Sequence, residues 1–204
     1  VDFIALNTDE QDLLDCDAPT KLDIGQSTTR GLGAGADPAV GERAARDNSQ
    51  DIEDVLTGAD MVFVTAGEGG GTGTGGAPIV AGIARGLGAL TVAVVTKPFS
   101  FEGKRRADNA EHGIEKLRDA CDTLITIPND RLLQQEDKTI SINEAFSKAD
   151  EVLFNGVQGI TDLISTPGLI NVDFADVKSV LADSGAALMG IGRASGNDLS
   201  LIHI

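Results

Sequence analysis

The chain has 204 residues, of which 41% are hydrophobic, 24% charged and 3% aromatic. This length suits one large domain, or one domain with part of a second, and it can bury a core without disulfides or a metal. No apolar run reaches the roughly 18 residues that a membrane-spanning helix needs. The composition also excludes collagen, coiled-coil and disulfide-scaffold proteins.

The charge balance is strongly acidic, with 16 basic residues against 32 acidic ones and a formal net charge of −16. Phosphate backbones are bound by clustered Lys and Arg, so we expect no nucleic-acid partner. The acidic excess fits an ordinary cytoplasmic protein, and it fits equally a protein from a high-salt cytoplasm, where screening makes dense charge tolerable. Cys16 and Cys121 are isolated in the sequence, which is typical of a reducing compartment.

Short apolar runs alternate with helical patterns along the chain, which favours an α/β fold: a Rossmann-like parallel sheet with helices on both faces. The expected strands are residues 2–6, 61–66, 90–96, 122–127 and 187–191. The expected helices are residues 38–48, 49–57, 76–87, 102–119, 141–165 and 173–183. The run at 61–66 is continuously apolar, which predicts a strand buried on both faces.

A glycine-rich segment, GEGGGTGTGG at residues 67–76, connects the strand 61–66 to the next helix. Seven of its ten residues are glycine, and such density costs backbone entropy that an ordinary turn would not require. Backbone N–H groups that approach an anion at a helix N-terminus do require it. Thr72 and Thr74 add hydroxyl donors, so the segment predicts a phosphate-binding loop.

Two common phosphate loops fit this segment poorly. A Walker loop needs Gly-Lys-Ser/Thr, and no Lys lies between Asp60 and Lys97. Gly71-x-Gly73-x-x-Gly76 matches the dinucleotide pattern, but the acid expected at the end of the next strand is replaced by residues 96–98, Thr-Lys-Pro. A dinucleotide-binding oxidoreductase therefore stays a remote alternative.

The sequence GGGTGTG at 69–75 resembles the signature loop of the tubulin/FtsZ family of GTPases. Further segments resemble the FtsZ branch of that family in the same order, over residues 1 to about 193. They are NTD at 7–9, TRGLGAGADP at 29–38, PFSFEGKRR at 98–106, IPNDR at 127–131 and TPGLINVDFADVK at 166–178.

The resemblance implies a cytoplasmic GTPase that polymerises head-to-tail into the filaments of the cell-division ring at mid-cell. It implies GTP or GDP and Mg²⁺ as cofactors. It also implies self-association, accessory and membrane-tethering partner proteins, and no direct membrane insertion. A related cell-shape protein of the same superfamily is the alternative, although the acidic segment at 166–178 matches the division branch closely.

The resemblance divides the chain into a GTP-binding domain at 1–140, a central helix at 141–165, and an acidic catalytic segment with the start of a further domain at 166–193. Residues 194–204 form an atypical tail. Members of the family begin with a strand and a glycine-rich phosphate loop that would come before Val1 of this sequence. We therefore expect a fragment with weak or absent GTP binding.

The nucleotide contacts that the resemblance implies come from several loops and two helices. They are Asn7, Asp9, Gly33, Ala34, Gly35, Gly69, Gly70, Gly71, Thr72, Gly73, Thr74, Gly75, Pro98, Glu102, Arg106, Asn129, Phe146 and Asp150.

Some of these positions also have a plain structural interpretation. Glu102 and Arg106 are four residues apart, as in an ordinary helix ion pair, and Phe146 could be a core aromatic. Asn129 follows a strand at the edge where α/β sheets bind ligands. By the resemblance, the Asp150 carboxylate accepts hydrogen bonds from the guanine edge while Phe146 stacks on the base.

Asp173 and Asp176 are three residues apart at the start of an expected helix, where a carboxylate commonly caps the backbone. The resemblance instead makes them, with Asn171, the groups that polarise the attacking water. The helix at 141–165 would span about 36 Å, so these acids should serve the nucleotide of the next subunit. A head-to-tail contact of this kind that does not close builds a filament.

Overall fold

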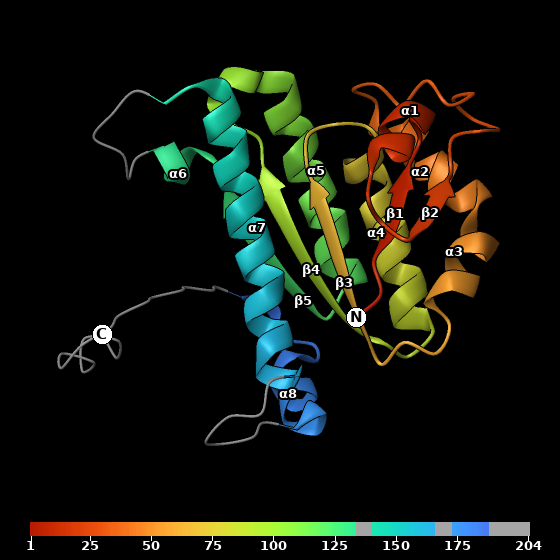
Figure 1. Ribbon diagram of the computed structural model, residues 1–204, viewed down its shortest axis with the longest axis vertical. Coiled ribbons are helices and arrows are strands. Elements are labelled where there is room, and N and C mark those ends of the chain that lie inside the picture. Colours follow the sequence, from red (N-terminus) through yellow and green to blue (C-terminus); the bar gives the residue numbers. More distant parts are fainter. Residues whose placement is uncertain (134–139, 166–172, 188–204) are drawn as a thin grey trace.

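The computed structural model describes residues 1–133, 140–165 and 173–187 (Figure 1). Its strands are β1 (Ile4–Asn7), β2 (Thr20–Asp23), β3 (Met61–Gly67), β4 (Leu90–Lys97), β5 (Thr123–Pro128) and β6 (Gly185–Ala187). Its helices are α1 (Glu10–Asp15), α2 (Pro38–Asp47), α3 (Ser49–Leu56), α4 (Thr72–Gly86), α5 (Lys104–Ala120), α6 (Asp130–Leu133), α7 (Ile142–Ser165) and α8 (Phe174–Leu181), with a short 3₁₀ turn at Ser100–Glu102.

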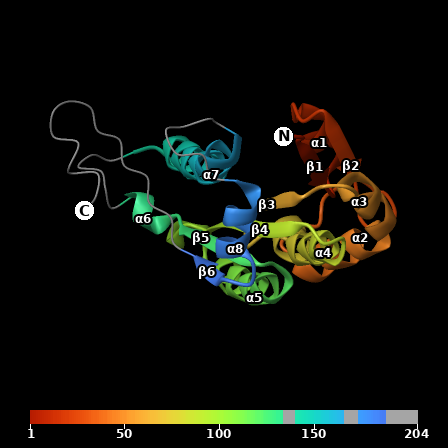
Figure 2. The same cartoon turned by 90° about the horizontal axis from the view of Figure 1, so that it is seen from below.

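The strands form two parallel sheets, β1-β2 and β3-β4-β5-β6. Helices α4 and α5 cover one face of the larger sheet and α7 covers the other (Figure 2). Parallel strands need crossover connections, and helices supply them here. The predicted α/β fold with helices on both faces is confirmed.

Strand β4 lies inside the larger sheet, and its side chains alternate between two cores. Val92 and Val94 pack in the cluster that contains Ile160 of α7 and Val177 of α8, whereas Ala93 packs with the side chains of α4 and α5. Successive residues of a strand point to opposite faces. The mostly apolar strand β4 therefore contributes side chains to both layers.

The prediction that residues 61–66 are buried on both faces is wrong. In β3, Val62 and Val64 are buried, while Met61 and Phe63 are half-buried and Thr65 is exposed. β3 is the outer strand of the larger sheet and has only β4 beside it among the described strands. Its second face is therefore covered less completely than that of β4.

Several element boundaries also differ from the prediction. Helix α4 begins at Thr72 instead of residue 76, so half of the glycine-rich segment is helical. Helix α5 begins at Lys104, after Gly103 with φ 100°. β6 covers Gly185–Ala187, and the rest of the strand expected at 187–191 lies outside the described residues.

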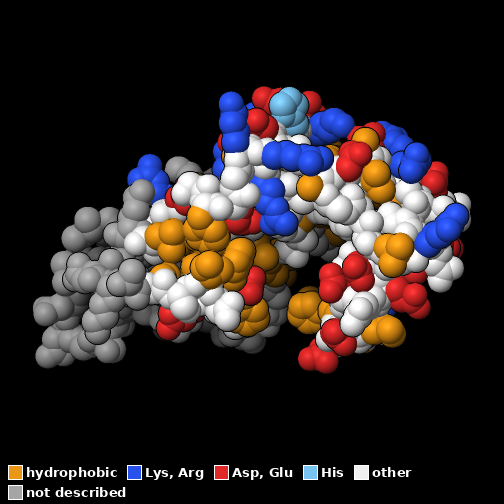
Figure 3. Space-filling view, turned by 90° about the horizontal axis from the view of Figure 1, so that it is seen from above, with side chains coloured by type: hydrophobic (Ala, Val, Ile, Leu, Met, Phe, Trp, Pro, Cys, Tyr) orange, Lys and Arg blue, Asp and Glu red, His pale blue; other side chains and the backbone are white. Residues whose placement is uncertain are grey.

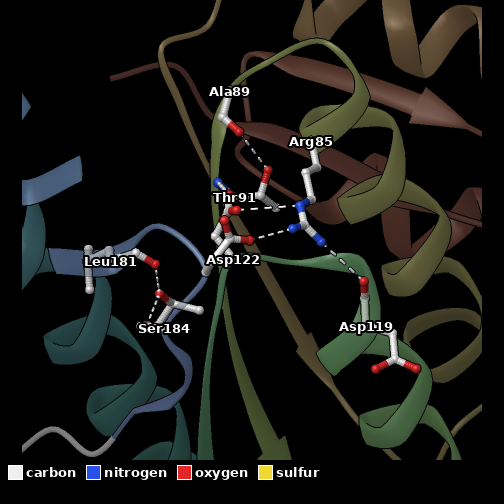
Figure 4. A network of polar contacts seen from close by, with 9 residues as sticks. Arg85, Ala89, Thr91, Asp119, Asp122, Leu181 and Ser184 are labelled. Carbon is white, nitrogen blue, oxygen red and sulfur yellow. Dashed lines mark hydrogen bonds and ion pairs between the residues drawn. The ribbon is translucent and has the colours of Figure 1, made fainter. Parts of the chain in front are cut away.

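The amino ends of β4 and β5 are held by a polar network with Arg85 at its centre (Figure 4). The Arg85 guanidinium contacts the Asp122 carboxylate at 3.4 Å and the Asp183 carboxylate at 2.6 Å. Asp122 also accepts a hydrogen bond from the Thr91 amide at 2.8 Å. The network therefore ties the end of α4 to the turn that follows α8.

Among the described helices, none is both long and apolar enough to cross a membrane.

Candidate nucleotide-binding site

The carboxyl ends of β3, β4 and β5 lie at one end of the larger sheet, at the top of Figure 1. The glycine-rich segment connects β3 to α4 at this end, and Gly71 caps the helix without a side-chain hydrogen bond. The amides of Gly70, Gly71 and Thr72 donate to no acceptor among the described residues. Free amides at the start of a 15-residue helix, where the helix dipole is positive, form an environment that favours an anion.

Close protein packing explains part of the glycine density. A Cβ on Gly71 would lie 2.6 Å from the Gly35 carbonyl oxygen, and one on Gly75 would overlap the Pro38 carbonyl oxygen of α2. Ligand approach, the reason expected from the sequence, is therefore not the only one. Gly70 differs, because a Cβ there would meet nothing within 4 Å. The structure thus leaves Gly70 as an open position in the loop.

A second turn, residues 31–35, lies directly against the glycine-rich segment, as the contact between Gly71 and Gly35 shows. Thr8 at the end of β1 holds this turn: its carbonyl accepts from the Gly33 amide at 2.9 Å and its hydroxyl accepts from the Ala34 amide at 2.9 Å. The same hydroxyl lies 2.6 Å from the Thr72 hydroxyl. Of the predicted Gly33, Ala34 and Gly35, the last two therefore contact the loop at 69–75 directly.

Thr8 is fully buried and was not among the predicted nucleotide contacts. Its two neighbours were predicted instead. The Asn7 side-chain oxygen accepts from the Thr8 amide at 2.8 Å and the Asp9 amide at 3.2 Å. The Asp9 carboxylate caps α1 by accepting from the Gln11 amide at 3.0 Å. Both side chains thus shape the local backbone, and their contact with a nucleotide stays a prediction.

The start of α5 brings basic side chains to this edge. Lys104, Arg105 and Arg106 are all exposed there, and the Arg106 Cβ lies 3.2 Å from where a Cβ on Gly69 would stand. In the view onto this end of the sheet, Lys and Arg side chains gather beside a hydrophobic cluster (Figure 3). Cations at a helix N-terminus oppose the helix dipole. Helix stability alone therefore does not explain three basic residues in a row at this position.

Helix α5 also ties the two loops together through residues that the sequence analysis missed. The Asn109 side-chain amide donates to the Ala36 carbonyl at 3.1 Å and to the Gly69 carbonyl at 3.4 Å. Arg105 donates to the same Ala36 carbonyl at 3.3 Å. A motif search could not find them, because an Asn one turn inside a helix has no distinctive sequence signal.

Glu102 and Arg106 form an ion pair at 2.6 Å within one helical turn. The other Glu102 carboxylate oxygen accepts from the Phe99 amide at 2.8 Å. This is the helix-pair arrangement considered from the sequence, and it occupies both oxygens of Glu102. Pro98 lies beside the Gly69 turn, 3.2 Å from the Cβ position there. Ribose or phosphate contacts of these residues stay predictions.

Phe146 on α7 is 40% exposed and packs edge-on against the rings of Phe99 and Phe101, at centroid distances of 5.4 and 6.2 Å. Asp150 is exposed one turn further along α7. Asn129 follows β5 as predicted, is only 4% exposed, and its side-chain oxygen has no hydrogen-bond partner. A buried oxygen that has no partner among the described residues, at the edge where α/β sheets bind ligands, calls for a partner such as a bound molecule.

Glu68 is the first residue of the loop after β3 and is only 5% exposed. Neither of its carboxylate oxygens makes a hydrogen bond of regular geometry within the described part of the chain. Burial raises the pKa of this carboxyl to about 7, and the nearby Thr74 hydroxyl offsets the rise only in part. The Thr74 hydroxyl itself accepts from the Gly69 amide at 2.8 Å. Glu68 was not among the predicted site residues.

The two predicted catalytic acids lie at the other end of the molecule, at the start of α8 near the bottom of Figure 1. Asp173 caps α8 by accepting from the Asp176 amide at 2.8 Å, and both side chains are exposed. They do not meet the glycine-rich segment within one chain. Asn171 lies outside the described residues. Among the described residues, no three His, Cys, Asp or Glu side chains form a cluster that could hold a metal ion.

Comparisons with known proteins agree on one family. The Tubulin/FtsZ family, GTPase domain, matches residues 1–137. An empty FtsZ dimer from M. jannaschii is 51% identical with a TM-score of 0.87, covering 90% of this chain and 53% of that one. A W319Y mutant of FtsZ from M. jannaschii is 49% identical with a TM-score of 0.92, covering 96% and 59%. GDP-bound monomeric CetZ1 from Haloferax volcanii is 26% identical with a TM-score of 0.74, covering 90% and 55%.

Proposed function

Because the chain belongs to the tubulin/FtsZ family of GTPases, we propose that it binds GTP at the carboxyl edge of the larger sheet and hydrolyses it in head-to-tail filaments. The observation that carries this proposal is the contact between two loops, at 31–35 and 68–71, beside the basic start of α5. Free amides, a helix dipole and exposed cations all favour a polyphosphate there.

The nucleotide base would lie toward the start of α7. Phe146 is exposed and could stack on the base, and the exposed Asp150 carboxylate can accept from the N1–H and amino groups of guanine. Adenine lacks that pair of donors, so Asp150 would select guanine. The unpartnered Asn129 oxygen supports a polar ligand at the same edge.

Mg²⁺ fits this arrangement as a cofactor that the nucleotide itself holds. Mg²⁺ commonly binds phosphate oxygens, water and one or two carboxylates, and the described residues contain no larger cluster of metal ligands. The second Asp9 carboxylate oxygen faces the 31–35 turn, 3.3 Å from a Cβ position on Gly33, and is one candidate ligand. When bound, the ion would neutralise charge on the phosphates.

Hydrolysis would be completed across a subunit contact. Asp173 and Asp176 start α8, which follows α7, and a helix of 24 residues spans about 36 Å. In a head-to-tail filament, the acids of one subunit would orient water at the nucleotide of the next, with Asn171 beside them. The FtsZ dimer from M. jannaschii supports self-association in this family.

The sequence identity of this chain is 51% to that FtsZ and 26% to CetZ1. The difference supports a role in the cell-division branch of the family, in a ring at mid-cell, together with the accessory and membrane-tethering proteins of that ring.

Two measurements on the natural-length protein test the proposal. Titration calorimetry should show GTP binding and no NAD binding. The second measurement tests whether two subunits share one hydrolytic site, by mixing the double variant Asp173→Ala/Asp176→Ala with the variant Gly70→Asp. The Gly70→Asp change places a carboxylate among the free amides of the loop and should block binding of the nucleotide. Each variant alone should be inactive, while the mixture should recover part of the activity, because one supplies the nucleotide site and the other the acids. A mixture as inactive as its components would contradict the shared site.

A further inference from the structure

Thr8 occupies a position between the two loops of the site. Thr8 is fully buried. Its carbonyl accepts hydrogen bonds from the Gly33 amide at 2.9 Å and from the Thr29 hydroxyl at 2.7 Å. The side chain is therefore fixed in place. Its hydroxyl has two neighbours, the Ala34 amide at 2.9 Å and the Thr72 hydroxyl at 2.6 Å.

The direction of the hydrogen bond between the two hydroxyls follows from counting donors. The Ala34 amide has only a proton to give, so the Thr8 oxygen accepts there. Among the described residues, the Thr72 oxygen is the one acceptor that the Thr8 hydroxyl reaches. Buried donors are almost always paired. Thr8 must therefore donate to Thr72, because the opposite direction would leave the Thr8 proton unpaired in a fully buried position.

This direction leaves the Thr72 proton free. Thr72 is half-buried at the first position of α4, next to the unpaired amides of Gly70 and Gly71. A chain of hydrogen bonds thus runs from the Ala34 amide through Thr8 to Thr72, and each bond polarises the next. The last donor of the chain lies at the edge of the anion site.

We infer that Thr8 is a positioning residue that orients the Thr72 hydroxyl to donate to a phosphate oxygen of the nucleotide. The inference rests on the proposed function, because it takes the anion to be GTP. Thr8 itself does not contact the ligand. It also connects the 31–35 turn to the glycine-rich segment, so that the two loops present their donors together.

The test is calorimetric titration of the natural-length protein with GTP. Thr8→Val keeps the side-chain shape and removes the hydroxyl, and we expect GTP binding to weaken about tenfold, as for loss of a hydrogen bond to a charged group. Thr8→Ser should restore affinity to within about twofold, because it restores the donor. Thr72→Val should weaken binding as much as Thr8→Val does. The double variant should be no weaker than Thr72→Val alone, because Thr8 acts through Thr72.

Thr29→Val separates this role from general support of the turn. It removes hydrogen bonds to the carbonyls of Thr8 and Gly25 but leaves the hydroxyl chain intact. We expect it to lower the melting temperature about as much as Thr8→Val does, with a clearly smaller loss of GTP affinity. Equal losses of GTP affinity in the two variants would overturn the inference.

Thr8→Cys provides the same comparison if the valine variant does not fold, because a thiol is a weaker donor of similar size. Wild-type affinity in Thr8→Cys or Thr8→Val, together with weak binding in Thr72→Val, would overturn the inference and leave the proposed function standing. A natural-length protein that binds no GTP would overturn both.

Discussion

Burial of Glu68 should make the stability of this protein depend on pH in a direction opposite to that of most carboxylates. The pKa of Glu68 is raised from an ordinary 4.5 to about 7, chiefly by burial. Between these two values the folded chain holds a proton that the unfolded chain has lost. The free energy of unfolding should therefore fall as pH rises from about 4.5 to 7.

The size of the effect follows from the pKa difference. One pKa unit corresponds to 1.36 kcal/mol, so ionisation of Glu68 in the folded state should destabilise it by about 3 kcal/mol above pH 7. This is a large fraction of the 5–15 kcal/mol typical of a domain. Other groups act in the opposite direction, since hydrogen bonds from Lys116 and Arg46 lower the pKa of Glu42. Wild type alone therefore cannot isolate the contribution of Glu68.

The variant Glu68→Gln isolates the contribution of Glu68 to the pH dependence of stability. Urea unfolding of wild type and variant at pH 4.5 and pH 8 gives the stability difference between them at each pH. We expect this difference to shift by about 3 kcal/mol in favour of the variant at the higher pH, because all other carboxylates cancel in the comparison. Glu115→Gln, an exposed carboxylate on α5, is the matched control and should show little shift. A difference independent of pH would refute the reasoning.

Substitutions at four other positions test particular contacts. Gly70→Asp should abolish GTP binding while Gly70→Asn retains most of it, because a side chain fits at this open position and only the charge repels phosphate; equal effects of the two in calorimetry would contradict this. Asp173→Ala should lose about 1 kcal/mol of stability with its helix cap, whereas Asp173→Asn should keep the cap and still lose GTP hydrolysis. Arg85→Ala should destabilise by about 1–3 kcal/mol in urea unfolding, because it leaves the mostly buried Asp122 without its cation. Asp183→Asn should cost less than about 1 kcal/mol, because that pair is exposed.

The long periodic elements were predictable from the sequence, and the short ones were not. Helix α7 begins and ends within one residue of its predicted bounds, because its apolar residues recur every three or four positions over 24 residues. α1 and β2 were missed. β2 has four residues, two of them charged, and its pairing with β1 depends on a tertiary contact that local patterns do not contain.

The candidate site shows the same division. The sequence predicted that loops 31–35 and 69–75 would face one ligand, and the structure brings them into contact. It gave no indication of Thr8, Asn109 or Glu68, because their roles depend on burial and on partners far away in the chain. The reason expected for the glycines was incomplete: Gly71 and Gly75 are required by close backbone packing, and their contact with a nucleotide stays a prediction.

The carboxylates nearest the glycine-rich segment suggest how so acidic a chain can accommodate an anion. The Glu102 carboxylate is paired with Arg106 and the Phe99 amide, and the Asp9 carboxylate caps α1. Among the described residues Glu68 has only the Thr74 hydroxyl nearby and no cation, and its raised pKa leaves it largely neutral below pH 7. Its ionisation would add a negative charge to a residue that lies within four positions of the free amides of Gly70, Gly71 and Thr72 in the chain. GTP binding and protonation of Glu68 should therefore favour each other by reciprocal linkage, and GTP affinity should weaken above pH 7 in wild type but not in Glu68→Gln.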